Sequence, residues 1–412
     1  MGAFITELVR IDEDGASLEV EGSVISSFKS MQKTRQGLRL FQDGLVTTAS
    51  YLGQVNEAEL LQSAQANQGA GVPYAYRLPK NALFDRSFAH PELRGLEALH
   101  RQAAEALDFL RSRNDRFLYN GKAISKRVTR TLKNSQGVQL RVEQDQAYWW
   151  LGYKHRDSRD IFDGYFDAYS TERFDFLDSV QRNLPLLAAF EALLPAAKGK
   201  RKIVFANPAP LLNKLSESLR IDRYREGACL FAGRLGQPLF HTKFSLFDVR
   251  LDPAHCAVAP FDGEGTLSPE ALPLIEAGIF KNVICDLYHG QKYGVPSTGN
   301  GQRQPDANAS LGFNELAVGR GIRSTQALLR SLDDCILVTM SMGGDSTDQG
   351  ELSLPVGLAF QYKGGECLGR LEPFTLTGNL KDILGGGFIE AASDGHERGA
   401  LNPCVAVEME LL

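Results

Sequence analysis

The chain has 412 residues, of which 43% are hydrophobic and 23% are charged, so it is long enough for two or three domains with buried cores. Its net charge of −5 gives no overall attraction to nucleic acid or to an anionic membrane surface. No segment approaches the roughly 18 consecutive apolar residues that a membrane helix needs. The N-terminus also lacks a basic region followed by an apolar one. We therefore expect a soluble, cytoplasmic protein with no membrane partner.

The cysteines favour a reduced state. They lie far apart, none forms a CxxC pair, and most lie inside apolar runs. Buried, reduced thiols are therefore expected. The residues concerned are Cys229, Cys256, Cys285, Cys335, Cys367 and Cys404.

Alternating polarity predicts strands near the N-terminus. Apolar residues from Leu18 to Phe28 share one parity, while the residues between them are largely polar, which is typical of a half-buried strand. Asp43-Gly44 between two apolar runs predicts a hairpin. Leucine and alanine recur at helical spacing after residue 95. The expected elements are strands over 18–28, 37–41 and 45–50, helices over 57–67 and 96–110, and a long connection over 68–95.

A second hairpin is expected around the turn at 134–137, and a helix over 171–194. Residues 195–202 have the composition of a solvated linker. Beyond them, short apolar runs separated by glycine-rich turns predict antiparallel strands, at 203–205, 228–233, 255–260, 335–342, 354–362 and 404–411.

These elements together predict an α+β fold. An N-terminal α+β region of hairpins packed with helices should precede a larger, mostly antiparallel β C-terminal domain. The expected divisions are an N-terminal α+β subdomain over 1–95, a central α+β subdomain over 96–200 and a β-rich C-terminal domain over 201–412.

The stretch from 261 to 303 contains three predicted turns. FDGEG at 261–265 and EAG at 276–278 indicate tight bends, and STGNG at 297–301 is a loop of small residues. Such a loop suits either a structural turn or a surface that binds an extended peptide main chain. Asn300 could pair with a peptide amide, and Arg303 with a carbonyl or carboxylate. The candidate peptide-binding residues are Ser297, Thr298, Gly299, Asn300 and Arg303.

The search for catalytic motifs gives no catalytic residue. A zinc site on one helix needs two histidines four residues apart, and no histidine here has a partner at that spacing. His396-Glu397 imitates the start of such a motif, but Ala400 occupies the position of the second histidine, so a surface turn is expected. The GxSxG, Walker and GxGxxG motifs are absent.

A run of basic residues from Lys122 to Arg141 could follow a phosphate backbone. It straddles a predicted hairpin whose alternate residues should point into water, so a solvated strand face is favoured over a nucleic-acid surface. Tyr148, Trp149 and Trp150 are adjacent, and a strand would divide them between its two faces. Core packing is therefore favoured over a ligand cage.

The order of the motifs along the chain resembles that of the PmbA/TldD family, once called modulators of DNA gyrase and regarded as a two-subunit metalloprotease system. The matching segments extend over nearly the whole chain. They are GLRLFQDG (37–44) with TTAS (47–50), NSQG (134–137), FDGEG (261–265), LIEAGIF (274–280), STGNG (297–301) and TGNLKDIL (377–384).

In that family the zinc-carrying subunit has an HExxxH helix soon after the domain boundary. The matching stretch here, 207–217, contains no histidine. Pro210 lies near its first turn, and leucines form an apolar stripe, which predicts a packing helix. GNLKD also resembles the zinc-free subunit, called PmbA or TldE, whereas STGNGQR is closer to the zinc subunit. The resemblance thus implies no cofactor in this chain and zinc in a partner subunit.

Three functions remain open. The resemblance implies first a non-catalytic subunit that pairs with a TldD-like zinc subunit, or with itself, and helps enclose an unfolded peptide for cleavage or maturation. The second is an autonomous peptidase of the same family whose site is built from dispersed residues, which metal content would reveal. The third is a regulatory binding protein linked to DNA gyrase, which salt-dependent DNA binding would reveal.

Overall fold

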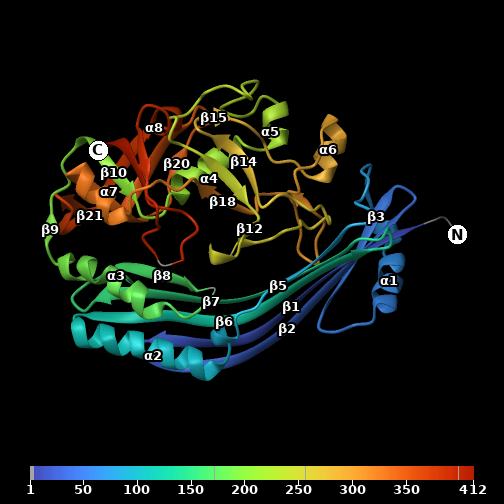
Figure 1. Cartoon of the computed structure of the whole chain (residues 1–412), viewed down its shortest axis with the longest axis horizontal. Helices are drawn as coiled ribbons and strands as arrows, with labels where there is room; N and C mark the ends of the chain where they lie inside the picture. Colours follow the sequence, from blue (N-terminus) through green and yellow to red (C-terminus); the bar gives the residue numbers. More distant parts are fainter. Residues whose placement is uncertain (1–3, 171, 256, 398) are drawn as a thin grey trace.

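The computed structural model describes residues 4–412 except Thr171, Cys256 and Arg398. The expected thiol state of Cys256 and the expected helix start at Thr171 therefore lie outside the described residues. A sheet of long strands forms one layer, and the C-terminal part of the chain packs along it as a second layer (Figure 1). Within the described residues, no helix has both the length and the apolar character that crossing a membrane requires.

The N-terminal sheet has the strand order β4-β3-β2-β1-β6-β7-β5, with β8 also paired to β7. The segments expected as N-terminal and central subdomains both contribute to it, because β1 pairs with β6. The hairpins at Asp43-Gly44 and at 134–137 are confirmed as the β2–β3 and β6–β7 connections. The strands are β1 (Ile5–Glu21), β2 (Val24–Gln42), β3 (Leu45–Leu52), β4 (Val72–Pro73), β5 (Leu83–Phe88), β6 (Phe117–Asn134), β7 (Gln139–His155) and β8 (Gly164–Ser170).

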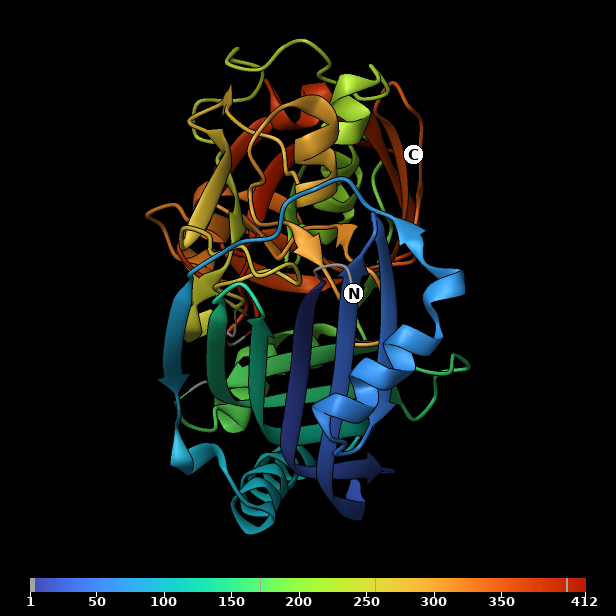
Figure 2. The ribbon, with the colours of Figure 1, turned by 90° about the vertical axis from the view of Figure 1, so that its right-hand side faces the viewer.

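Three helices cover parts of this sheet. Figure 2 shows α1 (Glu57–Ala66) crossing the strands at one end and α2 (Leu96–Arg113) below them at the other. The residues that α2 buries recur at three- and four-residue spacing, as the sequence predicted. The helix expected over 171–194 is shorter and is α3 (Phe176–Ala189). Trp149 is buried and stacks on Phe176, which confirms core packing for this residue, whereas Tyr148 and Trp150 on the opposite face of the strand are only half-buried.

One strand was missed in the N-terminal region. The segment expected to be a long connection contains β5, which pairs in parallel with β7. Its ladder partners lie more than fifty residues away, and four of its six residues are polar or exposed, so no local pattern marks it. Two 3₁₀ turns, Gln68–Ala70 and Pro91–Leu93, flank it.

The C-terminal domain is built on a sheet with the order β19-β10-β25-β23-β21-β22-β9. Because β19 also pairs with β21, five of these strands close into a ring. The strands are β9 (Leu193–Leu194), β10 (Gly199–Phe205), β19 (Asp334–Ser341), β20 (Asp345–Ser346), β21 (Glu351–Lys363), β22 (Glu366–Leu371), β23 (Phe374–Asn379), β24 (Phe388–Ala391) and β25 (Val405–Leu411).

The expected linker at 195–202 is partly wrong. Residues from Gly199 onward already belong to β10, in a ladder with β25 that starts at Gly199 opposite Leu411. Lys200 and Lys202 alternate outward along this strand, and Lys200 pairs with Glu408 at 2.7 Å. The basic residues that suggested a linker therefore belong to the exposed face of strand β10.

A smaller sheet with the order β15-β14-β11-β18 lies beside the ring. Its β14–β15 turn places Ala277 at φ 46° and Gly278 at φ 79°, the left-handed pair that a two-residue hairpin needs, so that prediction is confirmed. The strand expected at 228–233 is absent from that described segment, and among the described residues of 255–260 only those of β13 form a strand. The elements here are β11 (Leu246–Val249), β12 (Leu251–Asp252), β13 (Ala257–Val258), β14 (Ala271–Glu276), β15 (Ile279–Phe280), β16 (Gly301–Gln302), β17 (Ser310–Leu311) and β18 (Glu315–Val318).

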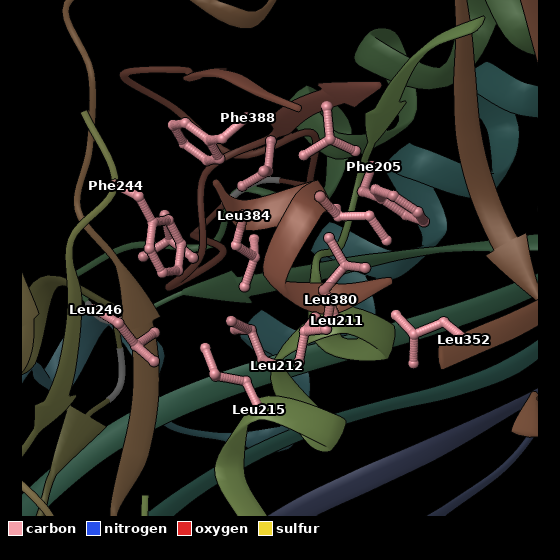
Figure 3. Close-up of a cluster of buried hydrophobic side chains, with 14 of the residues drawn as sticks. Phe205, Leu211, Leu212, Leu215, Phe244, Leu246, Leu352, Leu380, Leu384 and Phe388 are labelled. Carbon is pink, nitrogen blue, oxygen red and sulfur yellow. The ribbon is translucent and has the colours of Figure 1, made fainter. Parts of the chain in front are cut away.

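The core of the C-terminal domain surrounds α4, as Figure 3 shows. Leu211, Leu212 and Leu215 of this helix pack against Phe244 and Leu380, which confirms the predicted packing helix. The expected α+β fold, with an antiparallel β-rich C-terminal domain, is confirmed. The helices of this domain are α4 (Ala209–Glu217), α5 (Ile221–Arg225), α6 (Leu287–Tyr293), α7 (Thr325–Leu332) and α8 (Leu380–Leu384).

Candidate functional site

A cavity of about 790 Å³ lies between the N-terminal sheet and the C-terminal domain. One wall comes from β6, β7 and β8, and the opposite wall from α4, β18, Glu397 and residues 399–402. Figure 1 shows these elements facing one another across the two layers. The volume lies in the range of small-molecule and peptide pockets, roughly 300 to 1,000 Å³.

The sheet wall presents two tyrosines and a carboxyl group. Tyr148 on β7 lies directly opposite Tyr169 on β8, and their ring centroids are 4.9 Å apart. Asp167 is two residues from Tyr169 and so shares its face, where its Oδ1 accepts a 3.4 Å hydrogen bond from the Tyr148 hydroxyl. Burial raises the pKa of Asp167 to about 6. Burial, with the nearby Asp167 charge, also raises the pKa of Tyr148.

Helix α4 presents its polar face to the cavity. Ala209, Asn213 and Ser216 lie on one side of the helix at spacings of four and three residues, and all three line the cavity. Zinc in proteins is held by thiolate, imidazole or carboxylate groups, and these side chains offer none of them. The residues that α4 presents to the cavity therefore do not fit a zinc ion.

The other described residues of the chain also offer no metal site. There, no group of three His, Cys, Asp or Glu side chains is placed to hold a metal ion. The state of the chain in solution, with or without zinc, stays a prediction.

Strand β18 supplies the edge of the opposite wall. Asn402 donates to the Leu316 carbonyl at 2.9 Å and accepts from the Val318 N–H at 2.9 Å, so its side-chain amide occupies the outer edge of β18. Glu315, at the start of the strand, lines the cavity with an exposed side chain. The surrounding protein shields the Glu315 carboxyl group from water, which raises its pKa, and the charge of Asp248 raises it further.

His396 and Glu397 do not form the expected surface turn. Both are packed against α3, where His396 Nε2 lies 3.3 Å from Asn183 Oδ1 and Asn183 Nδ2 donates to Glu397 Oε2 at 3.4 Å. Burial lowers the pKa of His396 to about 4. Burial, and then the charge of Asp167, raises the pKa of Glu397 to about 8. The turn prediction was wrong because the α3 partner of this segment is more than 200 residues away.

The predicted peptide-binding loop follows α6 and does not line this cavity. Ser297 donates its hydroxyl to the Cys285 carbonyl at 3.1 Å and accepts from the Gly299 N–H at 3.1 Å. The Cys285 N–H donates to Thr298 Oγ1 at 2.7 Å. Gly299 has a φ of 77°, which confirms a turn that favours glycine.

Asn300 is fully buried and engaged inside the protein. Its Nδ2 donates to Asp248 Oδ2 at 2.7 Å and to the Gly312 carbonyl at 2.9 Å, and its Oδ1 accepts from Arg250 at 2.7 Å. A peptide could reach this side chain only after one of these bonds was broken. Peptide contact through Asn300 stays a prediction.

Arg303 joins the C-terminal domain to the N-terminal sheet. Its guanidinium donates to Glu7 Oε1 at 2.6 Å, and Arg39 donates to the same oxygen at 2.6 Å. All three side chains are fully buried. Burial, and then the neighbouring Arg39 charge, lowers the pKa of Arg303 to about 9. Peptide contact through Arg303 also stays a prediction.

The FDGEG bend (261–265) is hydrogen-bonded to this loop through Asp262. Asp262 Oδ1 accepts from the N–H groups of Glu264 and Thr266 at 2.9 Å each, and its Oδ2 accepts from the Gly301 N–H at 2.9 Å. A Cβ on Gly301 would lie 2.3 Å from Glu264 Oε2, so this position requires glycine. Burial raises the pKa of Asp262 to about 6 and that of Glu264 to about 8.

Sequence reasoning missed Asp248, which connects the loop to the cavity. Its Oδ1 accepts from the N–H groups of Asn314 at 2.7 Å and Glu315 at 3.2 Å, while its Oδ2 accepts from Asn300. An aspartate inside a short strand offers no local signal for such a role. Only the pairing of β11 with β18 brings these groups together.

The basic run is largely paired with acidic residues on neighbouring strands. Lys122 pairs with Glu19 at 3.2 Å, and Lys126 with Glu13 at 2.7 Å. Arg130 differs, since it packs over the ring of Phe261 with its guanidinium carbon 5.2 Å from the centroid. The expected solvated strand face is therefore partly wrong, because cross-strand ion pairs and one aromatic contact occupy much of it.

Comparison with known proteins places these features in a family context. Residues 198–408, about half of the chain, match the family model of the PmbA/TldA metallopeptidase C-terminal domain. A protein of Methanocaldococcus jannaschii with no assigned function is 23% identical over 99% of this chain and 96% of its own length.

Two solved structures share the whole fold. The crystal structure of TldE from Thermococcus kodakarensis superposes with a TM-score of 0.86 at 20% identity, over 99% of this chain and 96% of that one. A Thermotoga maritima protein proposed to be a modulator of a DNA gyrase gives 0.82 at 17% identity, over 99% and 96%. At these identities the likeness concerns the fold.

Proposed function

Because the chain belongs to the PmbA/TldD metallopeptidase family, we propose that it is the zinc-free subunit of a two-subunit peptidase. It would hold an unfolded peptide in the cavity between the N-terminal sheet and α4, while a zinc-bearing partner cleaves the peptide. The observation that carries this proposal is the polar face of α4. Asn213 and Ser216 face the cavity there, in the stretch that the family resemblance aligns with the HExxxH helix of the zinc subunit.

The shape of the cavity supports a peptide as the ligand. Its volume of about 790 Å³ exceeds what a single side chain requires, and both walls contain strands. Apolar groups such as Ile124, Leu212 and Phe313 alternate with polar ones around it, as expected for a site that receives mixed side chains. The fold shared with TldE supports a role beside a second subunit of the same family.

The loop Ser297–Arg303 enters this proposal through Asp248. Asn300 donates to Asp248, and Asp248 accepts from the N–H groups of Asn314 and Glu315. Asn300 thereby helps to position the start of β18 in the cavity wall. The loop thus positions the peptide site. Ser297 and Thr298 are half-buried residues, and they would contact only a peptide long enough to extend beyond the cavity.

The partner is a TldD-like zinc subunit, and a second copy of this chain takes its place when that subunit is not supplied. Elemental analysis of the purified chain, and of the chain co-purified with a TldD-like subunit, tests the proposal. We expect no stoichiometric zinc in the chain alone and one zinc in each mixed pair. About one zinc per chain in the isolated protein would contradict the assignment.

A further inference from the structure

The cavity wall carries an excess of carboxyl groups. Asp167 projects from β8 and Glu315 from β18, so the charged carboxyl groups come from both layers of the molecule. Glu397 also lines the cavity, but its raised pKa keeps it protonated at neutral pH, so it adds no charge. Within the part of the chain that the structure describes, none of the three is ion-paired with a lysine or arginine. Asp167 contacts Tyr148, while Glu397 contacts Asn183, Ser179 and His396.

The basic groups that the structure describes in the same wall are already paired with other acids. Lys126 donates to Glu13 Oε1 at 2.7 Å, across the β1–β6 ladder. His255 Nδ1 lies 2.8 Å from Asp252 Oδ2. Neither group therefore balances the carboxyl groups of the cavity, and a cationic ligand would do so.

The rest of the lining suits a long side chain with a charged end. The Tyr148 and Tyr169 rings stand together on the sheet wall, and tyrosine faces attract ammonium and guanidinium groups. Leu212 and Phe313 on the other wall offer apolar contact to a methylene stem. Aromatic, apolar and acidic groups thus meet in one cavity of about 790 Å³.

We propose that this cavity binds the side chain of a lysine or arginine within an extended peptide, with the cationic head group paired to Asp167 and Glu315. The inference rests on the proposed function and adds a substrate class to it. A neutral side chain of the same length would leave both carboxyl groups without a counter-ion, so the peptide that carries the cation binds more tightly.

Binding of matched peptides to the purified chain tests the proposal. The probes are short, unstructured, fluorescently labelled peptides that are identical except for one central residue, which is lysine, norleucine or glutamate. We expect the lysine peptide to bind roughly tenfold more tightly than the norleucine peptide, the scale of one charge-assisted hydrogen bond. Added salt should reduce this preference.

Variants then locate the preference. Glu315→Gln changes an exposed side chain for which no hydrogen bond through its carboxyl group is described, so this variant should fold. It should lower affinity for the lysine peptide and leave affinity for the norleucine peptide unchanged. Asp167→Asn should act in the same way. Glu366→Gln, at an exposed strand position outside the cavity, is the matched control and should change neither affinity.

The outcomes separate the inference from the function on which it rests. Equal binding of the lysine and norleucine peptides would overturn the cation preference while leaving peptide binding intact. A lysine preference that survives both Glu315→Gln and Asp167→Asn would also overturn it, because the cation would then lie elsewhere. If no peptide binds, the proposed function fails and the inference fails with it.

Discussion

Asn300 donates its side-chain amide to Asp248 at 2.7 Å, and through Asp248 a loop outside the main cavity is tied to the cavity wall. The second oxygen of the Asp248 carboxylate accepts the N–H of Glu315, the first residue of β18. Asn300 also accepts from Arg250, so both groups of its amide are engaged. The small-residue loop therefore affects the cavity wall indirectly, through the hydrogen bonds of Asp248.

Replacing Asn300 should reduce stability. Asn300→Ala leaves Asp248 and Arg250 buried with fewer partners, and an unsatisfied buried polar group costs about 1 to 3 kcal/mol. We expect a loss of that size in the free energy of unfolding, measured by chemical denaturation. Asn308→Ala, at an exposed asparagine nearby, is the control and should change little. Equal stability of both variants and the wild type would show that the Asp248 network is dispensable.

Glu7 should matter more to stability than a partly exposed glutamate on the same strand. Glu7→Ala leaves Arg39 and Arg303 buried beside each other without their shared carboxylate, a change that typically costs about 3 to 5 kcal/mol. Glu19→Ala removes a partly exposed ion pair with Lys122 and should cost about 1 kcal/mol or less. Thermal unfolding of the two variants provides the comparison, and similar melting temperatures would contradict the buried-triad account.

A bulky residue on the polar face of α4 should block peptide binding. Asn213→Trp places an indole in the cavity, while Glu217→Trp adds the same group to an exposed position of α4 that does not line this cavity. We expect the first variant to weaken peptide binding at least tenfold and the second to leave it unchanged, with both folded by circular dichroism. Full peptide affinity in Asn213→Trp would place the binding site elsewhere.

Stability should depend on pH through Glu397. Its folded-state pKa of about 8 lies above the unfolded value near 4.5, so the folded state keeps a proton that the unfolded state releases between these values. Its contribution to stability is therefore present at low pH and is lost as the pH rises from about 4.5 to 8. Glutamine cannot titrate, so Glu397→Gln should gain stability relative to the wild type across this window.

Urea denaturation of both proteins at several pH values measures the difference. Glu366→Gln, a change of the same kind at an exposed glutamate, should show no such trend. A constant difference between Glu397→Gln and the wild type from pH 4.5 to pH 8 would show that Glu397 is not a protonated buried group.

The predictable parts of this molecule are those specified by neighbouring residues. The hairpin at Ala277-Gly278 follows from local backbone preference, and the leucine stripe of α4 follows from helical spacing. Asp248 was missed and Glu397 was wrongly predicted to lie in a surface turn, because their partners are distant in the chain and meet them only through sheet pairing and domain packing. The loop at Asn300 was recognised as a turn, but its burial depends on the same long-range contacts.

The most direct test of the zinc-free subunit assignment is cleavage of an unfolded peptide by reconstituted proteins. The chain alone, a TldD-like zinc subunit alone, and the two mixed should be compared on the same peptide at equal zinc concentration. If this chain is the zinc-free subunit, only the mixture should cleave the peptide efficiently, and Asn213→Trp should abolish that cleavage. Cleavage by this chain alone, at the rate of the mixture, would contradict the account.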